Sequence, residues 1–171
     1  MEAVHLPSQD ELQARYQQKL GFVPNLISEM LHHPVAAQYY DYGVSALEAR
    51  GLLSTAEQQV VYFTISHLNK CHYCTTAHKF AAKNAGNITD QVLDAIVNEK
   101  PLENKRLNAL VKAARLIHDK KGWLTKADML TIRAQGVTHD EVIEVLMINS
   151  IKTMSNYINH IKNTAIDAAM Q

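Results

Sequence analysis

The chain has 171 residues, of which 47% are hydrophobic and 20% are charged, and its 17 basic and 17 acidic side chains give a formal net charge of zero. This length suits one domain, and the composition is that of a folded globular protein rather than a disordered one. A balanced charge lacks the basic field that nucleic-acid binding needs, and no stretch approaches the ~20 apolar residues of a membrane-spanning helix. We therefore expect a single domain over 1–171, with neither nucleic acid nor a membrane as partner.

Helix signals dominate the sequence, and no window alternates polar and apolar residues for long enough to make a convincing strand. Gly21 can end a first helix, and prolines can open the next two. Capping boxes, which start helices, are expected at Ser54 with Glu57 and at Thr138 with Glu141. In chain order, the expected helices are a segment that contains Leu12 and Tyr16, then 24–31, 34–50, 54–68, 71–84, 89–100, 104–120, 125–136 and 138–164. The pattern predicts an all-α fold.

The chain has only two cysteines, Cys71 and Cys74. A secreted disulfide framework normally has more cysteines at wider spacings, and residues 1–18 lack the apolar run of a signal peptide, so we expect a cytoplasmic protein. On a helix that begins near Cys71, the two cysteines are i, i+3 neighbours, and Cys74 and His78 are i, i+4 neighbours. All three side chains then share one face, which we expect to be open to solvent.

This arrangement predicts thiol–disulfide chemistry. The free amides at a helix start favour a thiolate, and His78 can exchange a proton with Cys74 near neutral pH. Once Cys74 has attacked a peroxide or a disulfide, Cys71 can close an intramolecular disulfide. Three alternatives stay open. The cysteines and His78 can hold zinc with His67 or His72, the cysteines can be buried as small hydrophobic residues, or they can react without help from His78.

The string C-H-Y-C-x-x-x-H at residues 71–78 resembles the carboxymuconolactone decarboxylase superfamily, in particular its alkylhydroperoxidase D-like, peroxidase-related branch. Residues 21–26 with 33–34, and residues 156–160, are similar to the same branch. The resemblance implies a bundle of about eight helices with a CxxC–His core near 54–86, assembled as a homo-oligomer, a trimer or a hexamer.

The resemblance also implies roles for individual residues. Cys74 is the attacking cysteine, Cys71 resolves the intermediate, and His78 belongs to a proton relay. No organic cofactor is implied, because the redox group is the Cys71–Cys74 disulfide, and the electrons come from a dithiol protein that the sequence does not identify. The function implied is that of a thiol-dependent peroxidase or disulfide reductase in antioxidant defence.

Two positions depart from the family pattern. The relay of the family ends in a glutamate twelve residues before the first cysteine, where this chain has Gln59. Because an amide cannot accept a proton as a carboxylate does, and general base catalysis contributes about 10²–10⁴-fold, we expect weak turnover of small hydroperoxides. Tyr73 replaces a histidine of the better-studied branch and can still donate a hydrogen bond. The alternatives are a carboxymuconolactone decarboxylase-type lyase, whose chemistry needs no cysteine pair, and a non-catalytic or metal-binding oligomer.

Overall fold

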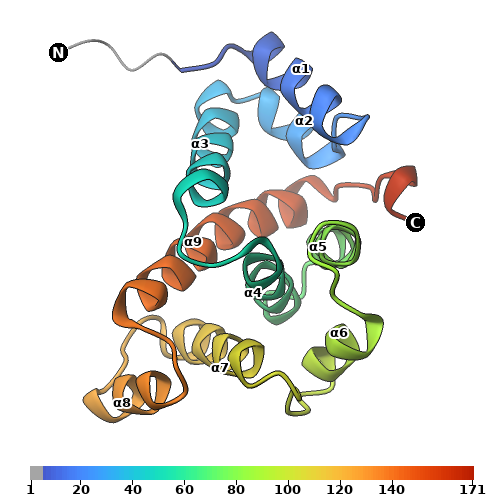
Figure 1. Ribbon diagram of the computed structural model, residues 1–171. Helices are drawn as coiled ribbons and strands as arrows, with labels where there is room; N and C mark the ends of the chain where they lie inside the picture. The colour runs from blue at the N-terminus through green and yellow to red at the C-terminus, as the bar shows by residue number, and fades with distance from the viewer. Residues whose placement is uncertain (1–5) are drawn as a thin grey trace, which may run out of the picture.

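The computed structural model describes residues 6–171 and confirms the all-α fold, with nine α-helices in that range rather than about eight (Figure 1). The helices are α1 Gln9–Leu20, α2 Asn25–Leu31, α3 Pro34–Arg50, α4 Thr55–Leu68, α5 His72–Asn84, α6 Asp90–Val97, α7 Lys105–Lys120, α8 Lys126–Ala134 and α9 His139–Lys162. A single 3₁₀ turn, Ala168–Met170, follows near the C-terminus. None of these helices is both long and apolar enough to cross a membrane.

The helix ends follow the local signals of the sequence. Both predicted capping boxes are present, at Ser54 ahead of α4 and at Thr138 ahead of α9. Gly21 ends α1 in the left-handed conformation with φ +81°, which glycine adopts without steric cost. Pro24 is the N-cap of α2 rather than its first helical residue, and Thr89 precedes α6 without a side-chain capping bond. These differences are within one residue of the expected boundaries.

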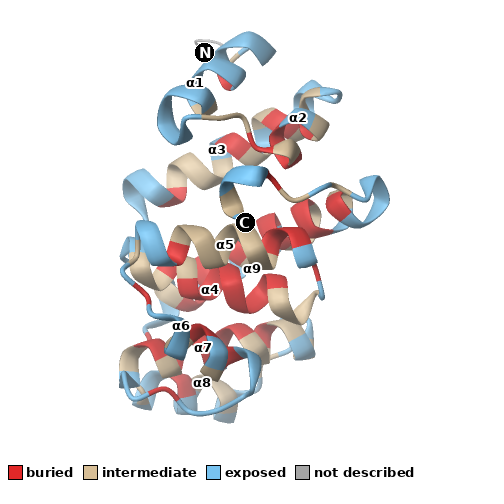
Figure 2. Cartoon of the chain, turned by 90° about the vertical axis from the view of Figure 1, so that its right-hand side faces the viewer, coloured by how far each residue is buried: buried red, intermediate tan, exposed pale blue. Residues whose placement is uncertain are grey.

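Helix α4 lies at the centre of the bundle and packs against α5, α6, α7 and α9. Its interior is buried on all sides, from Val60 through Ser66, as expected of a helix that is apolar around most of its circumference. Figure 2 shows this burial as a continuous band through α4 and the adjoining part of α9. Three residues separate the end of α4 from the start of α5, so the central helix α4 holds the start of α5 in place.

The long helix α9 changes character along its length. Its first half buries apolar residues such as Val145 and Ile148 in the main core with α4 and α7. Its second half buries polar side chains instead: Lys152, Ser155, Asn156 and Asn159. Since buried polar groups need partners, this half of α9 must face polar groups of its neighbours.

A separate layer lies over the start of α5. It consists of α1, α2 and residues 163–171, which we call the cover. Figure 1 shows α1 and α2 at the N-terminal end of the bundle, with the C-terminal segment returning toward them. The cover contributes Leu12, Leu26, Met30 and Ile166 to an apolar cluster that also contains both cysteines. The N-terminal helices therefore pack directly on the predicted redox site.

Candidate active site

The two cysteines lie at the N-terminus of α5. Cys71 is the N-cap residue in an extended conformation, and Cys74 is the third helical residue. The chain reaches this position through Lys70, whose φ of +56° turns it between α4 and α5, and the Cys71 amide donates to the carbonyl of Ser66 at 3.0 Å. Both cysteines are free thiols in the structure. Cys74 thus sits in the first turn, where the helix dipole favours negative charge.

The Cys74 sulfur has two partners from α9. The Lys152 ammonium lies 3.4 Å from Cys74 Sγ, and Asn159 Nδ2 donates to the same sulfur at 3.1 Å. Lys152 is almost completely buried, with 1% of its surface exposed. A buried ammonium requires a negative partner, and the thiolate of Cys74 is in position to supply it.

The neighbours of the two sulfurs shift the pKa values of the Cys71 and Cys74 thiols in opposite directions. The hydrogen bond with Cys71, together with the positive charge of Lys152, holds the pKa of the Cys74 thiol well below its usual range, against the opposing effect of burial. For Cys71 the same hydrogen bond and its own burial raise the pKa well above the usual range. These opposite shifts favour a thiolate at Cys74 beside a protonated Cys71, and the thiolate is the nucleophilic form.

His78 lies one turn beyond Cys74 but turns to other partners. Its Nδ1 is 2.9 Å from Gln59 Oε1, and its ring stacks on Tyr62 with centroids 4.8 Å apart and an angle of 8°. Among residues 6–171 no hydrogen bond joins His78 to Cys74. Burial, together with the positive charge of Lys152, lowers the pKa of His78 well below its usual value. The ring is thus neutral, and because Gln59 Oε1 only accepts, Nδ1 carries the proton and Nε2 is free to accept one.

Tyr73 faces the cover instead of the sulfurs. Its hydroxyl donates to Asp167 Oδ2 at 2.6 Å and accepts from the Leu26 amide at 3.2 Å. The other oxygen of Asp167 accepts from the Asn25 amide at 2.9 Å. One buried carboxylate therefore joins the C-terminal segment, the start of α2 and the redox helix.

The sequence did not identify three residues of this site, namely Lys152, Asn159 and Asp167. Asn149, Lys152, Asn156 and Asn159 follow one another at helical spacing, and such a polar stripe on one face of a helix is a signal that sequence analysis can use. No comparable signal marks Asp167, which lies in the irregular C-terminal segment.

The expectation that solvent reaches both sulfurs is wrong for this conformation. Cys71 and Cys74 each expose 1% of their surface, and they lie in one apolar cluster with Leu12, Leu26 and Met30 of the cover. Within the described chain, no group of three or more His, Cys, Asp or Glu side chains is arranged to hold a metal ion.

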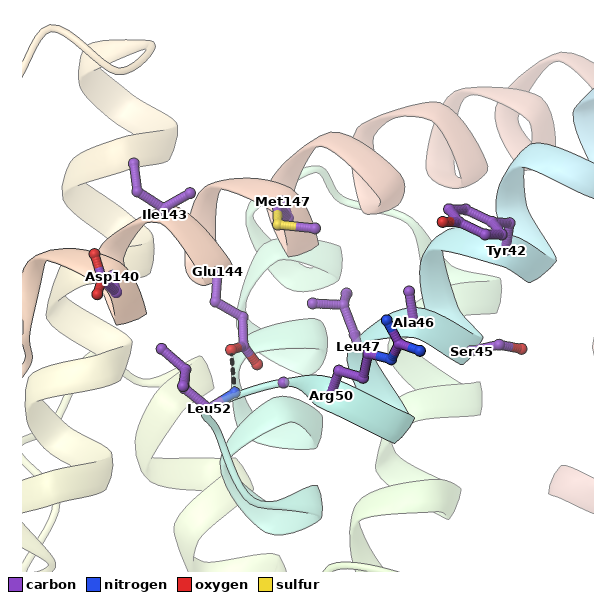
Figure 3. Close-up of a pocket in the computed structure, with 11 residues that line it drawn as sticks. Tyr42, Ser45, Ala46, Leu47, Arg50, Leu52, Asp140, Ile143, Glu144 and Met147 are labelled. Atoms are coloured by element: carbon purple, nitrogen blue, oxygen red, sulfur yellow. Dashed lines mark hydrogen bonds between the residues drawn. The ribbon is translucent and has the colours of Figure 1, made fainter. Parts of the chain in front are cut away.

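One hollow in the described part of the molecule lies away from the cysteines. It has a volume of about 550 Å³ and lies between the C-terminal half of α3 and the N-terminal half of α9, with Tyr42, Arg50, Ile143 and Met147 in its lining (Figure 3). At its base the Glu144 carboxylate accepts from the backbone amide of Leu52 at 2.5 Å (Figure 3). The same carboxylate accepts from the Leu53 amide at 3.2 Å and from Gln58 Nε2 at 3.3 Å. These bonds fix the turn between α3 and α4, and no cysteine or histidine lines the hollow.

Comparison with known proteins relates the chain to one family. Residues 34–116, which include both cysteines, match the sequence model of the carboxymuconolactone decarboxylase family. No curated sequence matches the chain.

Two similar crystal structures are peroxidase-related proteins of unassigned function. The one from Silicibacter sp. TM1040 has 21% identity and a TM-score of 0.81 over 98% of this chain and 90% of that one. The one from Ralstonia eutropha JMP134, described as an alkylhydroperoxidase AhpD core, has 20% identity and a TM-score of 0.84 over 97% and 92%.

A third similar structure is the debrominase Bmp8, with 20% identity and a TM-score of 0.77 over 99% of this chain and 91% of that one. A variant of Bmp8 has been solved in complex with 2,3,4-tribromopyrrole. At these identities the likeness establishes the fold alone.

Proposed function

We propose that this chain, whose residues 34–116 match the carboxymuconolactone decarboxylase family model and whose fold is that of an alkylhydroperoxidase AhpD core, is a thiol-dependent oxidoreductase. In this proposal Cys74 and Cys71 reduce hydroperoxides or disulfides as part of antioxidant defence. The observation that carries it is the buried Lys152 ammonium, 3.4 Å from the Cys74 sulfur. That contact favours a thiolate beside a protonated second thiol, which is the starting state that the chemistry needs.

The reaction with a hydroperoxide takes place in two steps. The Cys74 thiolate attacks the terminal oxygen, the O–O bond breaks, and the departing alkoxide takes a proton from water to leave as an alcohol. Cys74 is then a sulfenic acid. The Cys71 sulfur attacks the Cys74 sulfur, the S–O bond breaks, and water leaves with the Cys71 proton. The pair has lost two electrons, and a dithiol partner must return them by exchange.

The contacts of the site suggest a division of labour. Lys152 and Asn159 hold the negative charge of Cys74, so His78 is not needed as a permanent counter-charge. With a neutral ring and a free Nε2, His78 is proposed to accept and return a proton when Cys71 attacks. Gln59 orients that ring through its 2.9 Å contact but cannot take the proton further, which supports slow turnover with small hydroperoxides.

Access to the sulfurs requires that the cover move. Both cysteines are buried beneath α1 and α2, and the Tyr73–Asp167 contact holds these parts together. Opening of such a layer is slower than side-chain motion and can limit turnover. Tyr73 thus acts in this proposal on access, and not on the reactivity of the sulfur.

We also propose that the protein works in the cytoplasm, where thiols are kept reduced, and as a homo-oligomer, a trimer or a hexamer. Exposed apolar side chains along α3 and α9, among them Tyr42, Ile143 and Met147, offer a surface for a second copy. Light scattering of the purified protein tests the assembly, and a monomer would contradict it.

The proposed function is tested by peroxide-driven loss of free thiols, followed by mass spectrometry in the wild type, Cys71→Ser and Cys74→Ser. The wild type is expected to form an intramolecular disulfide. Cys71→Ser is expected to stop at a sulfenic acid on Cys74, and Cys74→Ser to stay reduced, because the remaining thiol is protonated. Equal, slow loss of thiols in all three proteins would refute a redox role for the pair.

A further inference from the structure

Lys152 is in an unusual environment for a lysine. Its side chain is 1% exposed, and among residues 6–171 the Cys74 sulfur is the one hydrogen-bond or ion-pair partner of its ammonium. The Tyr62 ring of α4 lies 5.9 Å away, measured from Nζ to the ring centroid. The other titratable groups near this point are Cys71 and His78 of α5 and the half-buried Tyr40 of α3. No carboxylate of the described chain forms a salt bridge with this ammonium.

Oxidation of the cysteine pair removes the partner of Lys152. In exchange with an external disulfide, the Cys74 thiolate attacks one sulfur and the first thiolate leaves. The Cys71 sulfur then attacks the Cys74 sulfur, the mixed disulfide breaks, and the second substrate sulfur leaves as a thiol with the proton of Cys71. The pair loses two electrons, and its negative charge departs with the reduced substrate. A neutral disulfide is left beside a buried ammonium, which is unfavourable because an unpaired buried charge is costly.

Building on the proposed function, we propose that Lys152 stabilises the reduced pair over the disulfide, so that Cys71–Cys74 is an oxidising disulfide that small dithiols reduce readily. Disulfides behave in this way when their reduced form is specifically stabilised. The partner that returns the electrons therefore need not be a strongly reducing protein. Any dithiol that can form a ring-closed disulfide and reach the opened site has the required chemistry.

The test is a redox titration of the folded, full-length protein in glutathione buffers of fixed thiol-to-disulfide ratio, with the disulfide fraction measured by mass spectrometry after acid quenching and alkylation. Lys152→Met removes the charge while keeping a similar length, and Lys152→Arg keeps the charge. Lys112→Met is the matched control, because Lys112 is exposed on α7 and remote from the pair. We expect Lys152→Met to form the disulfide with an equilibrium constant about tenfold larger, which corresponds to about 30 mV. The other two variants are expected to titrate like the wild type.

The outcomes separate this inference from the proposed function. If Lys152→Met and the wild type form the disulfide at the same glutathione ratio, the inference is wrong while the redox role of the pair stands. If no buffer produces the disulfide in any of the proteins, the proposed function fails as well.

A second measurement covers the case in which Lys152→Met does not fold. If the folded protein favours the reduced pair more than the unfolded chain does, folding is more favourable for the reduced protein than for the oxidised one. The reduced wild type is therefore expected to melt at a higher temperature than its oxidised form, whereas a stabilising disulfide would give the reverse order. The reverse order would overturn the inference without any variant.

Discussion

Helix α9 carries two buried charged residues, Glu144 and Lys152, about two turns apart, and they differ in the groups that they contact. The Glu144 carboxylate accepts hydrogen bonds from two backbone amides and one side-chain amide, and these bonds stabilise the turn between α3 and α4. Lys152 has the Cys74 sulfur as its partner, and a sulfur that enters a disulfide can no longer carry a negative charge. A buried charge whose partner is a fixed backbone group is structural, whereas one whose partner can react contributes to chemistry.

The two surroundings differ in the same way. The hollow beside Glu144, of about 550 Å³, is lined by no cysteine or histidine, whereas both cysteines are buried. This hollow therefore does not mark the cysteine pair. Because no residue is shared by the contacts of Glu144 and those of the Cys74 sulfur, substitutions in one region are expected to leave the other unchanged.

The largest change is expected from Gln59→Glu. A carboxylate 2.9 Å from His78 Nδ1 would complete a proton relay and favour the protonated ring. Peroxide consumption with an excess dithiol should rise by about 10²-fold. Gln91→Glu, the same change at an exposed position of α6, is the control and should give no gain. An unchanged rate for Gln59→Glu would contradict the relay.

Glu144→Ala tests the role of Glu144 in the turn between α3 and α4. Loss of the carboxylate leaves the Leu52 and Leu53 amides without their partner, so the free energy of unfolding should fall by about 2–3 kcal/mol in denaturant titrations. Met147→Ala, at the half-exposed rim of the same hollow, should lie within about 0.5–1 kcal/mol of the wild type. If folded Glu144→Ala protein lost thiol oxidation altogether, the two regions would not be independent.

Asp167→Ala tests the cover. The change removes the acceptor shared by Tyr73 and the Asn25 amide, so opening becomes easier and alkylation of the cysteines by iodoacetamide should become about tenfold faster, equivalent to about 1.4 kcal/mol. Asp94→Ala, an exposed acid on α6, is the control. Equal alkylation rates would show that Asp167 does not hold the cover closed.

The stability of the reduced protein should depend on pH in two opposite ways. The pKa of Cys74 is lowered by folding, so its contribution is full above the unfolded thiol value of about 8.5 and is lost as the pH falls toward the folded pKa. The pKa of Cys71 is raised, so its contribution is lost as the pH rises above about 8.5. Relative to the Cys71→Ser, Cys74→Ser double variant, stability should change by at most about 1.4 kcal/mol per pH unit and peak near pH 8.5. A profile without such a peak, measured by denaturant titration, would contradict these assignments.

The sequence predicted the parts of the molecule that local signals determine. Capping residues, prolines and Gly21 specify helix ends within a few residues, and the spacing of Cys71, Cys74 and His78 follows from the helix itself. The partners of Cys74 lie 78 and 85 residues away on α9, and their approach depends on how α9 crosses α5. Burial of the pair depends in turn on the cover, which contacts α5 through segments from both ends of the chain. These are tertiary properties that no local spacing encodes.

The most direct test of the account is a pH titration of the thiolate ultraviolet absorbance in the reduced protein. The wild type should show one thiolate at neutral pH that protonates well below the usual thiol pKa of about 8.5, and Lys152→Met should lose it while Lys112→Met retains it. If both wild-type cysteines ionise only near pH 8.5, or if Lys152→Met titrates like the wild type, then Lys152 does not hold a Cys74 thiolate and the central claim is wrong.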